Sequence, residues 1–147
     1  MVTAIILFHG NFYKDFAGFL LYIIVWLSAW FGVFITDWLL RRKRYDAESL
    51  VAERGGLYWR NGGVHWSAII ALAAGIVAAL MWINAAYDVP SYTGPISNHF
   101  PGLHGSDFSW ALGIIVSSLV YWALAAREVR KEADATPAEA AVETAGV

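Results

Sequence analysis

Three long stretches of the sequence are almost free of charge, and this feature limits its fold more than any other. They cover residues 16–40, 66–86 and 108–126, and Asp37 is the one charged residue within them. Crossing the hydrocarbon core takes about 20 apolar residues as a helix, and lipid offers no partner to the amides of an open strand. The sequence therefore predicts an all-α integral membrane protein with three transmembrane helices, over residues 14–40, 66–86 and 108–126.

The composition agrees with a membrane protein and excludes several other classes. Hydrophobic residues make up 59% of the chain and charged residues 15%, whereas soluble domains carry about 25% charged residues. The net charge of -2 does not indicate a nucleic-acid partner. The sequence contains no cysteine, which excludes disulfides, thiolate metal sites and a cysteine nucleophile.

Basic residues lie on one side of the predicted membrane. The connection 41–65 contains Arg41, Arg42, Lys43, Arg44, Arg54 and Arg60, while the connection 87–107 contains neither lysine nor arginine. By the positive-inside rule, 41–65 is cytosolic and 87–107 extracytoplasmic. The tail 127–147 is then cytosolic and is expected to be disordered or a frayed helix. We expect a multi-pass protein of the cell inner (plasma) membrane.

Asp37 is the strongest candidate for a functional residue within a spanning segment, because intramembrane carboxylates often form ion or proton sites. It lies one turn before Arg41, so an i,i+4 ion pair at the cytosolic end is the alternative that we favour. We interpret Asp37, Arg41, Arg42, Lys43 and Arg44 as topology anchors. The basic run could also attract anionic lipid.

Small residues in the apolar runs predict close helix packing. Gly18, Gly32 and Gly75 allow backbones to approach one another. Ser117 and Ser118 are expected to donate hydrogen bonds within their own helix or to a neighbouring one. We interpret these positions as packing sites.

Nothing in the sequence indicates an enzyme. The histidines are scattered without carboxylates at metal-ligand spacing; they are His9, His65, His99 and His104. Nucleophile elbows, phosphate-binding glycine loops and HExxH motifs do not occur. We expect no catalytic residue and no metal or other cofactor in this chain.

Two motifs resemble the nucleobase:cation symporter-1 family, of cytosine/purine permease type. The first is Trp26-Leu-Ser-Ala-Trp30 followed by Gly32-Val-Phe-Ile-Thr-Asp37-Trp-Leu-Leu-Arg41-Arg42, which is similar to the tenth helix of the family. The second runs from Tyr58 to Trp66 and is similar to the entry to its eleventh helix. Ala29 stands where the family often has proline, and His65 where it usually has asparagine. The resemblance covers about residues 10–127.

The resemblance implies the last helices of a twelve-helix transporter with an inverted-repeat, leucine-transporter-type fold. Residues 1–8 would be the end of the ninth helix, truncated, and the three apolar runs the tenth to twelfth. Substrate and coupling cation, sodium or proton, would be bound by helices absent from this chain. The expected function is that of the C-terminal portion of a permease for nucleobases or related heterocycles, which cannot transport alone. Its partners would be the lipid bilayer, the missing N-terminal helices and a nucleobase-like small molecule.

The resemblance also implies that the outer half of the tenth helix acts as a thin gate over the substrate. Its candidates here are Phe16, Phe19 and Leu20, with Gly18 as a flexible point. The alternative is that these residues only face lipid or neighbouring helices. A second hypothesis for the chain is a small free-standing membrane protein that acts as an assembly or regulatory subunit. The sequence does not identify the substrate or the coupling ion. It also does not decide whether the chain is a truncated gene model, a split subunit or a remnant.

Overall fold

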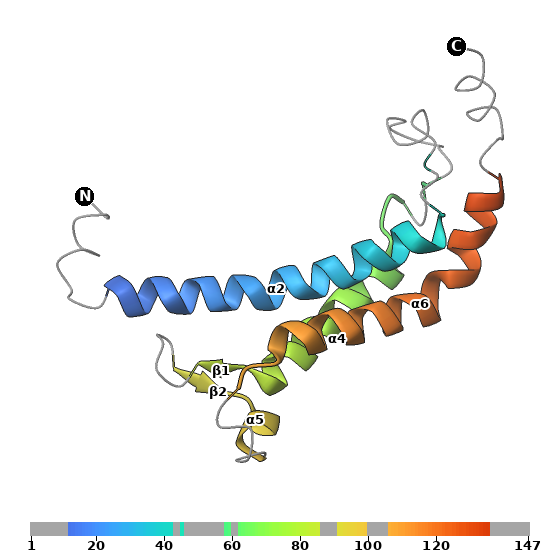
Figure 1. Ribbon diagram of the computed structural model, residues 1–147. Coiled ribbons are helices and arrows are strands. Elements are labelled where there is room, and N and C mark those ends of the chain that lie inside the picture. The colour runs from blue at the N-terminus through green and yellow to red at the C-terminus, as the bar shows by residue number, and fades with distance from the viewer. Residues whose placement is uncertain are drawn as a thin grey trace, which may run out of the picture.

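Three helices form most of the structure. The computed structural model describes residues 12–42, 45, 58–59, 62–85, 91–99 and 106–135. The long helices are α2 (Phe12–Leu40), α4 (Trp66–Trp82) and α6 (Ser109–Ala135). The α4–α6 connection holds a two-stranded hairpin of β1 (Asn84–Ala85) and β2 (Tyr92–Thr93), and then the short α5 (Pro95–His99). α2 and α6 run in the same direction and α4 in the opposite one (Figure 1).

Two of these helices are long and apolar enough to cross a membrane, over Lys14–Leu40 and Ser109–Asp134. The third, α4, is apolar but has 17 residues, fewer than the roughly 20 of a typical span. It ends before the predicted boundary at residue 86 because Ile83 has an extended backbone, with ψ 141°, and Asn84 pairs with Thr93.

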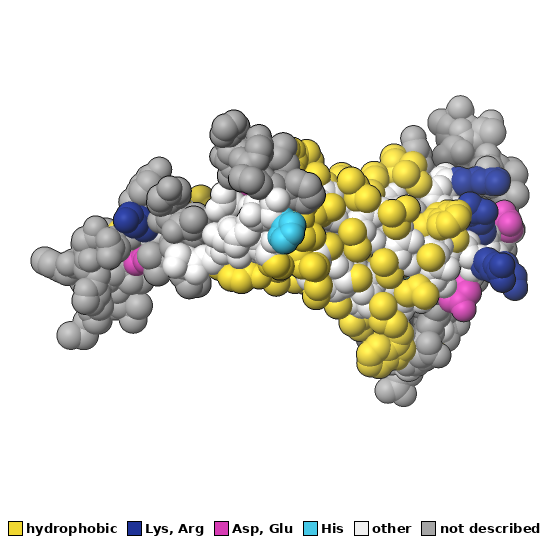
Figure 2. Space-filling view, turned by 90° about the horizontal axis from the view of Figure 1, so that it is seen from below, with side chains coloured by type: hydrophobic (Ala, Val, Ile, Leu, Met, Phe, Trp, Pro, Cys, Tyr) yellow, Lys and Arg dark blue, Asp and Glu magenta, His cyan; other side chains and the backbone are white. Residues whose placement is uncertain are grey.

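Large apolar side chains cover the outer surface. They include Trp26, Phe34, Val77, Leu119 and Trp122, all of them exposed. Figure 2 shows an apolar band over the middle of the molecule, with charged side chains gathered near the end where α6 finishes. Monomeric soluble proteins rarely expose apolar patches of this extent, so the surface agrees with a helical membrane protein.

Small residues form the contact between the helices. A Cβ atom added to Gly32 would overlap Ser117 Oγ, and one added to Gly75 would lie 2.9 Å from Ala29 Cβ. The hydroxyl of Ser117 donates to Gly113 O of its own helix (2.7 Å), and that of Ser118 donates across to Gly32 O (3.1 Å). The predicted packing role of Gly32, Gly75 and these serines is therefore confirmed; small side chains allow this close approach of backbones.

The last helix is longer than the predicted span of 108–126, because α6 continues past Ala126 to Ala135, which agrees with the helical alternative for the first part of the tail. Its residues 127–135 are mostly good helix formers, and Val129 and Ala133 extend the buried face of the helix. Residues 1–8 and 136–147, together with Lys43 and Arg44, lie outside the described part of the chain.

Candidate functional site

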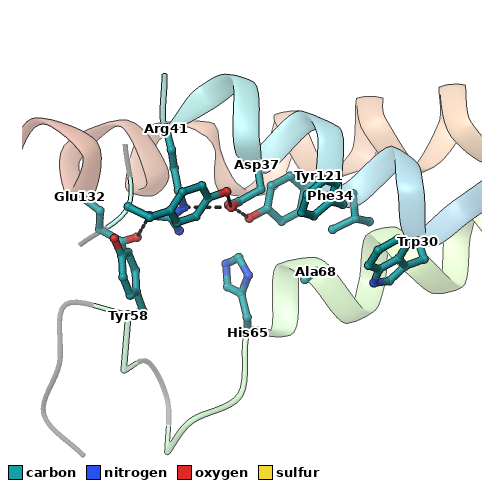
Figure 3. A pocket seen from close by; sticks show the side chains of 11 residues that line it. Trp30, Phe34, Asp37, Arg41, Tyr58, His65, Ala68, Tyr121 and Glu132 are labelled. Carbon is teal, nitrogen blue, oxygen red and sulfur yellow. Dashed lines mark hydrogen bonds and ion pairs between the residues drawn. The ribbon is translucent and has the colours of Figure 1, made fainter. Parts of the chain in front are cut away.

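Polar side chains gather where the C-terminal ends of α2 and α6 meet the N-terminal end of α4 (Figure 3). They border a cavity of about 360 Å³. Its polar lining consists of Asp37, Arg41, Tyr45, Tyr58, His65, Tyr121 and Glu132, and its apolar lining of Trp30, Val33, Phe34 and Ala68. The apolar part lies toward the middle of α2, so the cavity is polar at one end and apolar at the other.

Asp37 lies at the centre of this cluster and accepts three side-chain hydrogen bonds from the described residues. Its Oδ2 accepts from Arg41 Nε at 2.9 Å and from the Tyr45 hydroxyl at 3.0 Å. Its Oδ1 accepts from the Tyr121 hydroxyl at 2.6 Å. Both carboxylate oxygens are therefore engaged, one of them by a residue of another helix.

Arg41 joins two carboxylates. Besides its contact with Asp37, its Nη1 donates to Glu132 Oε2 at 3.0 Å, and its side chain is only 8% exposed. The guanidinium carbon lies 4.7 Å from the ring centroid of Tyr58 and 5.6 Å from that of Tyr45, within the range of cation–π attraction. Burial disfavours the charged guanidinium, but the hydrogen bonds and charges of Asp37 and Glu132 outweigh it and raise the pKa of Arg41. Arg41 thus stays protonated at any physiological pH.

Tyr45, which follows the end of α2, also keeps its proton. Burial, and after it the charge of Asp37 and the hydrogen bond to it, raise the pKa of Tyr45 to about 12. The phenol is consequently a lasting hydrogen-bond donor to Asp37.

His65 brings α4 into the same cluster. Its ring meets the ring of Tyr121 edge-on, with centroids 5.6 Å apart and an interplanar angle of 84°. Its carbonyl accepts from the amides of Ala68 (3.0 Å) and Ile69 (3.3 Å) at the start of α4. The N-terminus of α4 is thereby placed against α6.

The cluster is suited to holding helices together. Among the described residues, no group of three or more potential metal ligands lies close enough to bind an ion. The two carboxylates already share one cation, the guanidinium of Arg41. Charge-assisted hydrogen bonds of this kind are stronger than neutral ones, so the arrangement links α2 to α6.

The i,i+4 pair expected from the sequence is present, since Arg41 and Asp37 form an ion pair. Arg42 follows α2 in a left-handed conformation with φ 54°. It borders a second cavity, of about 350 Å³, with Arg130 and Asp134. Lys43 and Arg44, also predicted as anchors, are outside the described residues. The role of these residues in membrane topology stays a prediction.

Sequence reasoning missed Tyr121 and Glu132. They are eleven residues apart on α6, which is close to three helical turns and places them on one face. That spacing was the available signal, but Glu132 lies in the segment expected to be disordered or a frayed helix. Their contact with Asp37 and Arg41 requires the packing of two helices that are far apart in the sequence.

The gate candidates lie on the other half of α2, away from the polar cluster. Phe16, Phe19 and Leu20 are all exposed and Gly18 is buried. None of them lines the cavity beside Asp37. Their role as a gate stays a prediction.

Comparison with known proteins places the chain among transporters. Residues 1–113 match a family described as permease for cytosine/purines, uracil, thiamine, allantoin. The "Putative purine-cytosine permease YxlA" of Bacillus subtilis (strain 168) is 26% identical over 125 residues, which are 84% of this chain and 25% of that protein. The chain thus spans about a quarter of the length of this relative. No solved structure matches it significantly. The family match takes in all of α2 and α4 and the start of α6, and the chain therefore belongs to this family of permeases, which are transporters and not enzymes.

Proposed function

We propose that this chain supplies the last helices of a cation-coupled permease for nucleobases or related heterocycles, with α2, α4 and α6 as its tenth to twelfth helices. The observation that carries this proposal is the family match over residues 1–113, which contains two of the three long helices and the start of the third. The name of the Bacillus subtilis relative favours a purine or cytosine type of substrate.

The proposal includes three membrane spans and a cytosolic C-terminus in the inner membrane. The basic residues Arg41, Arg42 and Arg130 lie at the end where α2 and α6 finish, which is the cytosolic end by the positive-inside rule. A reporter fused after Val147 tests this orientation. Green fluorescent protein is expected to fluoresce there and alkaline phosphatase to be inactive; the reverse result would contradict it.

Binding of substrate and cation is assigned to helices other than those described. Both cavities described above lie near helix ends, whereas transporters of the inverted-repeat type hold their substrate near the bilayer midplane. The polar groups of the larger cavity also pair with one another, through Asp37 and Arg41. We therefore infer that these helices alone do not transport.

We further infer that the N-terminal half of α2 is the gate. Phe16 and Phe19 are exposed there, and this half of the helix diverges from α4 and α6 in Figure 1. The other half of α2 is packed through Ala29 and Gly32. Leu21, Tyr22 and Val25 pack against Ala79 and Ile83, so the less packed part of α2 is the stretch before Leu21. Side chains that protrude from that stretch are able to meet a substrate held by other helices, with Gly18 as the flexible point.

A chimaera with the relative tests the proposed function. This chain replaces the matching quarter of the Bacillus subtilis protein, and uptake of radiolabelled cytosine and adenine is measured in cells that lack their own permeases. We expect uptake by the chimaera and none by the chain alone. Loss of uptake without sodium, or with a proton uncoupler, identifies the coupling ion. A chimaera that reaches the membrane at normal levels but takes up neither base would overturn the proposal.

Alanine substitutions in the active chimaera test the gate. Phe16→Ala, Phe19→Ala and Leu20→Ala are each expected to lower uptake or to increase the escape of bound substrate. The control is Phe31→Ala, which removes a similarly exposed ring from the packed half of α2. Unchanged uptake and substrate retention in all three gate variants would exclude the assignment.

A further inference from the structure

Two residues of α6 converge on a single turn of α2. Tyr121 donates to Asp37, and Glu132 accepts from Arg41. Asp37 and Arg41 are one turn apart, whereas Tyr121 and Glu132 are about three turns, or roughly 16 Å, apart along their helix. Tyr121 and Glu132 thus contact this turn of α2 from two points of α6 that are well separated along its axis.

We propose that these four residues form a clasp that fixes the C-terminal end of α2 to α6, so that bending of α2 is confined to its N-terminal half. Tyr121 and Glu132 are then positioning residues, which act on the gate through the helix that carries it. The inference rests on the proposed function only for the identification of that half as a gate. The attachment itself depends on the contacts between α2 and α6.

Burial and geometry make the clasp a strong attachment. Arg41 is buried between its two carboxylates, and Tyr121 is also buried, at 1% exposure. Removing one member would take a hydrogen bond or an ion pair away from charged or polar groups of the others, which is costly at a buried site. The clasp therefore favours a single arrangement of the two helix ends.

The backbone ends α2 directly beside the clasp. Arg42 has a φ of 54°, a left-handed conformation that costs residues other than glycine about 1–2 kcal/mol. A left-handed residue just after the last turn is nevertheless a common way for a helix to end. Here the amide of Arg41 bonds to Asp37 O at 3.0 Å and that of Arg42 to Leu39 O at 3.1 Å, directly beside the clasp.

The C-terminal extension of α6, residues 127–135, positions one member of the clasp. Glu132 lies beyond Ala126, the predicted end of the membrane-spanning run. Without the helix over 127–135, its carboxylate would not be held opposite Arg41. The extension thus serves as the arm that carries one side of the clasp.

Distances between spin labels test the clasp directly. The chain has no cysteine, so pairs of cysteines can be introduced for labels without removing natural ones. One pair, Leu39→Cys with Leu124→Cys, reports on the clasped end, and another, Lys14→Cys with Trp110→Cys, on the other end. These four positions are exposed and outside the clasp. Distance distributions are measured by pulsed electron paramagnetic resonance on the full chain in lipid nanodiscs.

We expect a narrow distribution for the first pair and a broad one for the second. Combining Tyr121→Phe with Glu132→Gln should broaden the first distribution toward the width of the second and leave the second unchanged. The control combines Tyr92→Phe with Asp134→Asn, which makes the same types of change at exposed positions, and should alter neither. The inference would be overturned if the distance distribution of the first pair were already broad in the unmodified clasp, or if it stayed narrow in the double variant. A narrow distribution for the second pair would overturn it as well.

The same variants in the chimaera separate this inference from the proposed function. Absence of uptake with an intact clasp would overturn the proposed function but leave the attachment established by the label distances. Normal substrate uptake by the double variant, together with a broadened first distribution, would leave the attachment standing but overturn its positioning role for the gate. Reduced uptake that recovers in Glu132→Asp, which keeps the carboxylate, supports a positioning role.

Discussion

The hydroxyl of Tyr121 donates a 2.6 Å hydrogen bond to Oδ1 of Asp37, although the two residues are 84 positions apart in the chain. Asp37 therefore serves two helices, since its other oxygen pairs with Arg41 on its own helix. A carboxylate in a spanning segment is often an ion or proton site. The contacts of Asp37 instead indicate a structural role, because they connect α2 to α6.

Replacement of Arg41 by methionine should be among the most destabilising changes at this joint. The substitution leaves Asp37 and Glu132 without the cation that they share. We expect a loss of about 3 kcal/mol, near the lower end for breaking a buried ion pair because the cluster borders a cavity. Unfolding in mixed micelles, followed by circular dichroism, measures the change.

Lysine at the same position is the control for charge. Arg41→Lys should recover only part of the loss, because an ammonium group cannot contact both carboxylates while stacking on Tyr58. Wild-type stability of Arg41→Met would contradict the structural part assigned to the pair.

Gly32→Ala should disrupt the packing of α2 on α6. The added Cβ would overlap Ser117 Oγ and lie 2.6 Å from the carbonyl oxygen of Ile114. Overpacking of this kind costs about 1–3 kcal/mol, whereas alanine in place of an unpacked helical glycine would stabilise by about 1 kcal/mol. A lower free energy of unfolding in Gly32→Ala would thus show that Gly32 contacts α6, and a higher one would show that it faces open space.

Ser117→Ala combined with Gly32→Ala sharpens this test. The combination removes the overlap with the hydroxyl but not the contact with the backbone of Ile114. We expect partial recovery relative to Gly32→Ala alone. Complete recovery would show that the backbones of α2 and α6 are able to separate at this point.

The helices themselves could be predicted from sequence because lipid allows few other structures for long apolar segments. The ion pair of Asp37 and Arg41 could also be predicted, since it depends only on helical spacing. The end of α4 could not, because Asn84 leaves the helix to pair with Thr93. Hydropathy likewise places the end of α6 too early, because the contact of Glu132 with Arg41 joins segments 91 positions apart.

Alkaline pH should weaken the protein through Tyr45. Its pKa is about 12 in the folded protein and about 10 in an unfolded chain, so folding favours the protonated phenol. The resulting stabilisation is fully present below pH 10 and is lost as the pH rises toward about 12. Tyrosinate absorbance in a pH titration should show a late component, which is a tyrosine that ionises near pH 12. This component should be absent from Tyr45→Phe.

The charge of Asp37 contributes to this shift after burial. Asp37→Asn should therefore move the late component to lower pH without removing it. An identical titration of the Tyr45→Phe variant and the unmodified chain would contradict the prediction.

Asp107 should stabilise both the start of α6 and the hairpin. Its Oδ1 accepts from the amide of Ser109 at 2.7 Å, and its Oδ2 from the amide of Asn84 at 3.3 Å. Loss of a side chain that caps a helix costs about 1 kcal/mol. Asp107→Ala should accordingly increase amide hydrogen exchange at both residues, measured by mass spectrometry or nuclear magnetic resonance. Asp107→Asn keeps one acceptor oxygen and should protect only one of the two amides.

Ser109→Ala is the matched control, because it changes the same helix start without touching the carboxylate. The hydroxyl of Ser109 is buried and has no hydrogen-bond partner among the described residues, so its removal is expected to be neutral or slightly stabilising. Faster exchange at Asn84 in Asp107→Ala, but not in Ser109→Ala, would show that one carboxylate joins β1 to α6. Equal exchange in the two variants would show instead that the hairpin is held without Asp107.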